Sequence, residues 1–188
     1  PYGEPQYAYH DTTNHYHYRL VACGFEDIQS NERFVLNINH LRSKRGTGKE
    51  SNAKRMTNVD SLLVMLHNIQ ENQIFHDTDI LLVGDYNCYT QEQPIQTLIQ
   101  NGYEDLVMQY DSTGYSYVYH SEAGYLDRVF ASPTMAKQVK MVRPYHLNTD
   151  YFYSRGFKRG LDKTIFRYAD HDPILISIQL VPNHIHHD

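Results

Sequence analysis

Two polar residues follow a run of aliphatic side chains near the middle of the chain. After "DILLV" and Gly84 come Asp85 and Asn87, two positions apart. In an extended segment both side chains point the same way, so they could face one reacting centre. A carboxylate can hold a hard cation such as Mg²⁺ or orient water, and an amide can hydrogen-bond a phosphoryl oxygen without repelling it. Because Gly, Asp and Asn are favoured turn formers, a plain strand-to-loop turn is the alternative.

A histidine ends another predicted strand, within "NINHLRSK". His40 follows the alternating residues Asn37 and Asn39 and precedes the cations Arg42 and Lys44. A histidine there could protonate or hydrogen-bond a phosphate oxygen, and the cations would add attraction. The alternative is a strand-end histidine followed by a solvated basic loop.

A carboxylate also interrupts the apolar strand pattern of "YLDRVFAS". Asp127 needs a partner there, and a histidine would be a suitable one, because a carboxylate orients the ring and stabilises its protonated form. The alternatives are a surface pair with Arg128 or a position at the edge of a sheet.

The triplet Asp170-His171-Asp172 precedes Pro173 and the last predicted strand. The proline biases the residue before it towards an extended backbone. An aspartate beside a histidine could bind metal while the imidazole acts as general base or acid. An acidic turn before a strand is the alternative. Strand ends gather at one edge of a sandwich, so these four clusters could converge.

The elements that would position these residues are read from hydrophobic periodicity. Met56, Val59, Leu62, Leu63, Leu66 and Ile69 form one apolar stripe, which predicts a helix over 51–71. A second, short helix begins near residue 91 and stops at Asn101-Gly102. Strands are predicted over 18–27, 33–41, 78–87, 115–120, 125–132, 137–145 and 173–181. We therefore expect one α+β domain over 18–181, with a loop or arm at 1–17 and a tail at 182–188.

Composition limits the possible partners. The 188 residues include 17 basic and 22 acidic side chains, for a net charge of -5, which argues against nucleic-acid binding across the whole surface but not in a local groove. Two cysteines are too few for a disulfide framework; two buried thiols are favoured over a single bridge. No run approaches the ~18 apolar residues of a membrane span, and no signal peptide is visible.

The four clusters, in this order, resemble the endonuclease/exonuclease/phosphatase superfamily. The matching phrases are "NINHLRSK", "LLVGDYNCY", "YSYVYHSEAGYLDRVFAS" and "ADHDPILISI". The resemblance implies a four-layer α/β sandwich of two mainly antiparallel β-sheets flanked by helices. The first and third phrases most resemble the bacterial secreted or surface-linked nucleases, which implies an extracellular, periplasmic or cell-surface location.

The resemblance also implies roles for individual residues. His40 would contact phosphate, Asp85 and Asn87 would orient the nucleophile and bind phosphate, and Asp127 would orient the catalytic His171. Metal-ligand candidates are Asp170 and Asp85, with Mg²⁺ as the expected ion and Mn²⁺ or Ca²⁺ as alternatives. The substrate-binding candidates are Asn39, Arg42, Lys44, Arg45, Tyr117 and Arg155. The implied activity is a metal-dependent phosphodiesterase, most simply an endonuclease on DNA or RNA.

One feature of the superfamily has no match in residues 1–17. Its domain normally begins with a further half that carries an early asparagine and the glutamate that is the principal Mg²⁺ ligand. We therefore expect this chain to correspond to the C-terminal portion of such a domain, with metal affinity and activity in question. An exposed sheet face and a homodimer or swapped dimer would follow. A phospholipid or inositol-phosphate hydrolase and a non-catalytic binding module remain as alternatives.

Overall fold

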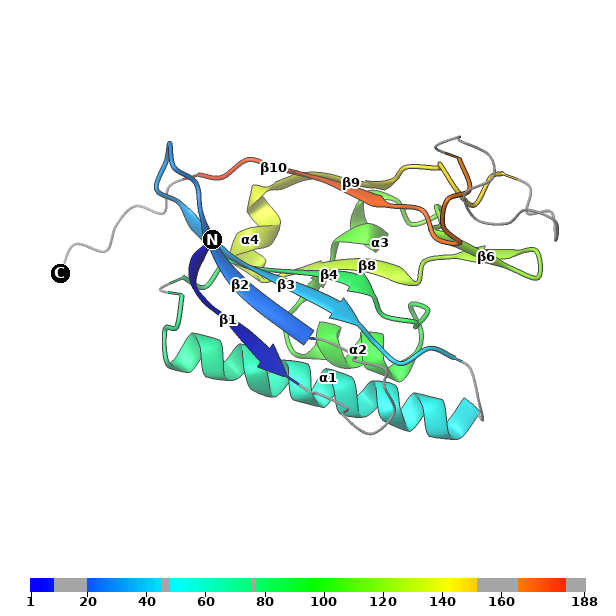
Figure 1. Ribbon diagram of the computed structural model, residues 1–188, viewed down its shortest axis with the longest axis horizontal. Coiled ribbons are helices and arrows are strands. Elements are labelled where there is room, and N and C mark those ends of the chain that lie inside the picture. The colour runs from blue at the N-terminus through cyan, green and yellow to red at the C-terminus, as the bar shows by residue number, and fades with distance from the viewer. Residues whose placement is uncertain (9–19, 45–47, 76, 152–165, 182–188) are drawn as a thin grey trace.

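A six-stranded β-sheet runs through the computed structural model, which describes residues 1–8, 20–44, 48–75, 77–151 and 166–181 (Figure 1). In spatial order its strands are β1 (Tyr2–Ala8), β2 (Leu20–Glu26), β3 (Arg33–His40), β4 (Ile80–Asp85), β8 (Asp127–Ala131) and β5 (Glu104–Asp105). Two smaller sheets pair β9 (Val139–Pro144) with β10 (Ile174–Ile178), and β6 (Tyr117–Tyr119) with β7 (Glu122–Gly124). The helices are α1 (Gly48–Glu71), α2 (Gln93–Gln100), α3 (Leu106–Tyr110) and α4 (Pro133–Gln138).

The direction of three adjacent strands brings distant residues to one edge of the large sheet. Strands β3 and β4 run parallel, so both end at the same edge, where His40 pairs with Asp85. Strand β8 runs antiparallel to β4, so Asp127, its first residue, pairs with Asp85 from the other side. The remaining neighbours in this sheet are antiparallel. Strand order alone therefore sets three polar residues side by side.

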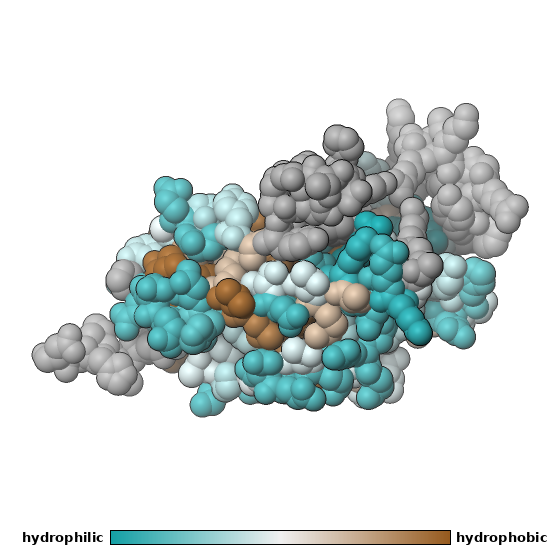
Figure 2. Space-filling model, turned by 90° about the horizontal axis from the view of Figure 1, so that it is seen from below, coloured by the Kyte–Doolittle hydropathy of each residue, from teal (hydrophilic) through white to brown (hydrophobic). Residues whose placement is uncertain are grey.

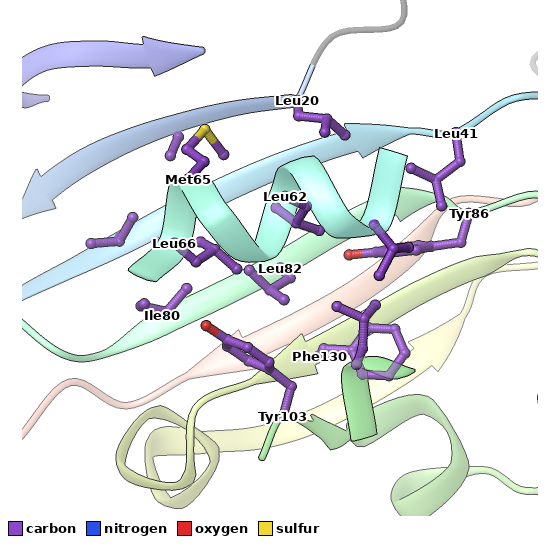
Figure 3. Close-up of a cluster of buried hydrophobic side chains, with 14 of the residues drawn as sticks. Leu20, Leu41, Leu62, Met65, Leu66, Ile80, Leu82, Tyr86, Tyr103 and Phe130 are labelled. Atoms are coloured by element: carbon purple, nitrogen blue, oxygen red, sulfur yellow. The ribbon is translucent and has the colours of Figure 1, made fainter. Parts of the chain in front are cut away.

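Helices α1 and α2 cover one face of the sheet (Figure 1). On α1, Val59, Leu62, Leu66 and Ile69 are buried, as their spacing of three and four residues predicts for one apolar face. Figure 3 shows how this stripe meets the inward side chains of the sheet. The helix begins at Gly48, three residues before the predicted start, and the second helix ends at Gln100, before Asn101 as predicted.

The opposite face of the sheet packs against β9, β10, α3 and α4. Between Phe34, Leu36 and Val83 on the large sheet and Ile174 and Ile176 on β10 lies an open apolar groove of ≈ 400 Å³. A helical layer, the large sheet and the β9–β10 sheet confirm the expected α+β sandwich. The expected homodimer or swapped dimer stays a prediction.

The face formed by α1 is mostly hydrophilic, with hydrophobic residues between (Figure 2, seen from below). Within the described residues, none of the helices combines the length and the apolar character that crossing a membrane requires.

The prediction of a loop over 1–17 is wrong for the first residues. Strand β1 pairs antiparallel with β2, from Tyr2 opposite Gly24 to Ala8 opposite Leu20. The register shifts between Tyr2 and Gln6, and Gly3 has a φ of +71°. Such an irregularity breaks the two-residue alternation by which a strand is recognised in a sequence. Residues 9–17 lie outside the described residues, as does the predicted tail at 182–188.

Both cysteines are free thiols, which confirms their predicted state and excludes a bridge between them. Cys88 is buried as expected, whereas Cys23 is only partly buried.

Gly84 meets a backbone contact that no other residue would tolerate. Its φ is +134°, and a Cβ there would lie 1.9 Å from the backbone oxygen of Asn39 on the paired strand. We therefore expect Gly84→Ala to lower the free energy of unfolding by about 3 kcal/mol or more, measured by urea denaturation. Gly102 has a φ of +89° and open space around it, so Gly102→Ala should cost only about 1 kcal/mol. Equal losses would contradict the steric explanation.

Candidate active site

A histidine and two carboxylates meet at the edge where β3 and β4 end. His171 Nδ1 lies 2.7 Å from Asp127 Oδ2, and His40 Nε2 lies 3.7 Å from Asp85 Oδ2. One potential ligand atom each from Asp85, Asp127 and His171 lies within 4.8 Å of the others. The segments that carry His40, Asp85, Asp127 and His171 are thus brought together, although up to 131 residues of sequence separate them.

Asp85 and Asn87 meet through a turn rather than through an extended segment. Asn87 has a φ of +51°, and its backbone N–H donates to Asp85 Oδ1 at 2.7 Å. Its side-chain amide donates to Asp85 Oδ2 at 2.9 Å and to the backbone oxygen of Leu41 at 3.1 Å. The prediction of an extended segment with both side chains on one side is therefore wrong, and the alternative, a strand-to-loop turn, is correct. The turn and the site are the same feature, because these hydrogen bonds fix the Asp85 carboxylate.

The imidazole of His171 is held from two sides. The Asp127 carboxylate accepts a hydrogen bond from His171 Nδ1 and another, at 2.6 Å, from the Ser116 hydroxyl. On the other side, the Tyr117 ring lies 4.5 Å from the imidazole, centroid to centroid. The Asp172 backbone N–H donates to the backbone oxygen of Ser116 at 2.8 Å, which ties this segment to the residue before β6. In the neutral ring, an Nδ1–H directed at Asp127 leaves the Nε2 lone pair to accept a proton.

The charges of the cluster change its proton affinities. Burial raises the pKa of Asp85, and the neighbouring charge of Asp127 raises it further. Burial alone would lower the pKa of His171, but the hydrogen bond and the charge of Asp127, followed by the charge of Asp85, outweigh it and raise the pKa. The site therefore concentrates negative charge around a histidine that is more basic than usual.

A divalent cation fits this cluster on chemical grounds. Carboxylate oxygens are the ligands that Mg²⁺, Mn²⁺ and Ca²⁺ prefer, and a cation would relieve the repulsion between Asp85 and Asp127. Asp127 Oδ2 accepts from both Ser116 and His171, whereas Asp85 Oδ1 and Oδ2 each accept one hydrogen bond from Asn87, so each Asp85 oxygen keeps a lone pair for a cation. Asp170, the other predicted ligand, is exposed and lies outside this group.

The predicted substrate-binding residues are placed differently from one another. Tyr117 is in contact with His171, and Arg42 lies two residues after the end of β3. Lys44 forms an ion pair with Glu92 and lies over the Tyr89 ring, 4.5 Å from its centroid.

The other predicted substrate-binding residues are Asn39, Arg45 and Arg155, and Asn39 does not reach the edge as expected. Asn39 is 2% exposed and donates to Asn37 and to the Tyr86 hydroxyl. It points to the face opposite His40, because adjacent strand residues alternate, which disagrees with a substrate contact. Arg45 and Arg155 lie outside the described residues.

Arg128 forms a buried ion pair that the sequence reading missed. Its guanidinium is 1% exposed, lies 2.9 Å from Asp105 and also donates to Thr90 at 2.8 Å. The suggested surface pair with Asp127 is wrong, because the two neighbours on β8 point to opposite faces.

Asp172 organises the loop before the last strand, a role that the acidic triplet did not reveal. Its carboxylate accepts from the backbone N–H groups of Leu147, Asn148 and Thr149 at 3.1, 2.7 and 3.1 Å. It also accepts from the Thr149 hydroxyl and lies 2.8 Å from His146 Nδ1. The loop over 146–149 is thereby fastened beside His171.

Asp172→Ala is expected to lower the free energy of unfolding by about 2–4 kcal/mol, because the backbone donors are left without their acceptor. Burial disfavours the charged form of Asp172, but the hydrogen bonds from Thr149 and His146 outweigh burial and lower the pKa of Asp172. A lowered pKa stabilises the fold above the ordinary value of 3.8, and this contribution is lost as the pH falls through the folded-state pKa. Urea denaturation at pH 7 and pH 3 should therefore give a smaller difference at pH 3. An equal loss of unfolding free energy at the two pH values would show that the charge of Asp172 does not contribute to stability.

Comparison with known proteins shows similarity in structure only. No protein-family model and no curated protein matches the sequence. One similar structure is an endonuclease/exonuclease/phosphatase family protein from Bacteroides thetaiotaomicron, with a TM-score of 0.59, 16% identity, and coverage of 90% of this chain and 58% of that one. The 3′-5′ exonuclease from Neisseria meningitidis has a TM-score of 0.59, 15% identity, and coverage of 94% and 71%.

An AP endonuclease from Archaeoglobus fulgidus is similar over 95% of this chain and 72% of that one, with a TM-score of 0.60 and 11% identity. This chain spans less than two thirds of the length of the Bacteroides protein. The arrangement of sheets and helices is nevertheless shared over nine tenths of the chain or more in all three cases. The chain therefore has the fold of the endonuclease/exonuclease/phosphatase proteins.

Proposed function

We propose that the protein hydrolyses phosphodiester bonds of nucleic acid with the help of a divalent metal ion. The observation that carries the proposal is the 2.7 Å contact between His171 and Asp127 beside the Asp85 carboxylate. An oriented imidazole next to a second carboxylate supplies a base and a metal ligand in one site. Structures with this fold include a 3′ phosphatase bound to a product DNA hairpin and an AP endonuclease, which supports nucleic acid as the substrate.

In the proposed reaction His171 Nε2 takes a proton from water, while Asp127 holds Nδ1 and stabilises the imidazolium. The water oxygen bonds to phosphorus in line with the leaving oxygen, whose bond to phosphorus breaks and which then takes up a proton from solvent. His40, at the exposed end of β3, donates to a phosphoryl oxygen as negative charge develops. Asn87 keeps the Asp85 carboxylate in place through its two hydrogen bonds.

Asp85 would hold the cation; Asp170, outside the Asp85–Asp127–His171 cluster, stays a candidate for a second ligand. When bound, Mg²⁺ or Mn²⁺ supplies Lewis-acid stabilisation of the phosphoryl oxygens. Arg42 and Lys44 would contact the phosphate backbone next to the site, which reconciles a net-acidic chain with a polyanionic substrate.

Plasmid nicking tests this function. Supercoiled DNA is incubated with the purified protein in Mg²⁺, in Mn²⁺ and in excess chelator, and relaxed DNA is expected only with the free ions. Sphingomyelin in mixed micelles and an inositol phosphate serve as parallel substrates. A single-stranded oligonucleotide is assayed beside the plasmid. Absence of cleavage of both DNAs in both ions, or turnover of the lipid or inositol phosphate alone, would overturn the assignment to nucleic acid.

A further inference from the structure

A row of aromatic rings leads from the candidate active site out to solvent. The Tyr117 ring lies 4.5 Å from the His171 ring, and the Tyr119 ring lies 6.3 Å from the Tyr117 ring at an interplanar angle of 11°. The His120 ring follows at 4.2 Å from Tyr119. Tyr119 is 57% exposed and His120 is also exposed. The inner end of the row therefore touches the proposed base, and the outer end is open to a ligand.

The hairpin that carries these rings is fixed relative to His171. Strands β6 and β7 pair from Tyr117 opposite Gly124 to Tyr119 opposite Glu122. The two connecting residues, His120 and Ser121, have φ values of +49° and +67°, the backbone of a tight two-residue hairpin turn. At the other end, Tyr117 forms an antiparallel bridge with His171. The aromatic row is thus a built surface with a set position beside the site.

The chemistry of the hairpin favours bases over phosphates as its ligand. The segment 115–124 contains four aromatic or histidine rings and no lysine or arginine, and its one charged residue is Glu122. Aromatic rings next to a backbone-binding site stack on nucleic-acid bases irrespective of sequence. The faces of paired bases are covered inside a duplex, whereas an unpaired base presents its faces to a protein.

We propose that Tyr119 and His120 form a stacking surface for an unpaired base beside the scissile phosphate, so that the substrate is a single strand or an unpaired segment. This inference rests on the proposed hydrolysis of nucleic-acid phosphodiesters. Tyr117 fixes the hairpin beside His171, while Tyr119 and His120 contact the base. The contact involves no lysine or arginine, so its contribution should change little with ionic strength.

The test compares a labelled single-stranded oligonucleotide with a strand of equal length built from abasic spacers. Both have the same phosphates, and only the first has bases. Binding is measured by fluorescence anisotropy in chelator, and cleavage separately in Mg²⁺ and Mn²⁺. We expect the protein to prefer the base-bearing strand by about 5- to 100-fold, the range that stacking of one base provides.

Tyr119→Ala should remove most of this preference, and Tyr119→Phe should retain it because the ring remains. Tyr7→Ala is the matched control, since Tyr7 is an exposed tyrosine on β1, three strands from β4 in the sheet order, and should leave the preference intact. The proposal is overturned if neither strand binds, if Tyr119→Ala keeps the preference, or if Tyr119→Phe loses it. Base-dependent binding without cleavage would reject the hydrolase alone, whereas cleavage without base preference would reject the stacking surface alone.

Discussion

His171→Ala is expected to lower kcat for phosphodiester cleavage by about 10²- to 10⁴-fold, the range for loss of a general base. The imidazole is the group that Asp127 orients at 2.7 Å and that the surrounding carboxylates make more basic. Binding of the oligonucleotide should change far less, because the phosphate and base contacts proposed here lie on other residues. Single-turnover cleavage measures the chemical step, and anisotropy in chelator measures binding.

His67→Ala is the matched control for this variant. His67 is an exposed histidine on α1 and is not part of the Asp85–Asp127–His171 cluster, so its loss should leave kcat unchanged. Thermal unfolding of both variants checks that the fold is retained. A fall of less than tenfold for His171→Ala, with a normal unfolding transition, would remove His171 from the role of base.

The position of His171 relative to Asp127 illustrates how far the sequence could reach. The sequence showed an aspartate inside an apolar strand and a histidine before another, and it predicted that the aspartate needs a partner and that a histidine would suit it. It could not show that β8 runs antiparallel to β4 and begins opposite Asp85, because strand order is set by the packing of the whole sheet. The resemblance supplied the pairing, and the structure supplied the distance.

Asn87 and Asp172 show where local patterns mislead. The two-residue spacing of Asp85 and Asn87 suggested an extended segment, yet Asn87 has a left-handed backbone because the Asp85 carboxylate accepts its N–H. Asp172 lies in a triplet of similar residues, and only the return of the chain at 147–149 decides that it is the buried one. Both outcomes depend on specific hydrogen bonds, which the spacing of residue types does not show.

The aromatic row escaped the sequence for a different reason. Tyrosines are frequent in this chain, and alternation in "YSYVYH" predicted a strand without indicating what its rings face. The bridge between Tyr117 and His171 joins segments 54 residues apart, which no local period can reveal. A functional surface made by two short elements is therefore visible only once the fold is known.

Asp127→Asn is expected to move the pH dependence of cleavage to lower pH and to lower its plateau on the order of 10²-fold. The amide oxygen can still accept from Ser116 and from His171, so the geometry is retained while the charge is lost. In the native site the Asp127 carboxylate raises the pKa of His171 above its ordinary value of 6.5. A base must be unprotonated, so the native rate should reach half its maximum above pH 6.5. Without the carboxylate, burial lowers the pKa and the rise occurs earlier.

Two measurements separate this explanation from a general loss of activity. Cleavage rates between pH 5 and 9 give the pH at which the rate reaches half its maximum. An NMR titration of the histidine ring protons gives the pKa of His171 directly, and the variant His171→Gln identifies the His171 signal. Asp127 also raises the pKa of Asp85, so a shifted rate profile alone could arise from either group. If the pKa of His171 is lower in Asp127→Asn and the rise of the cleavage rate with pH is shifted too, that rise reports deprotonation of the imidazole. A shifted profile with an unchanged His171 pKa would assign it to Asp85 instead, and the base would then be the carboxylate at the end of β4.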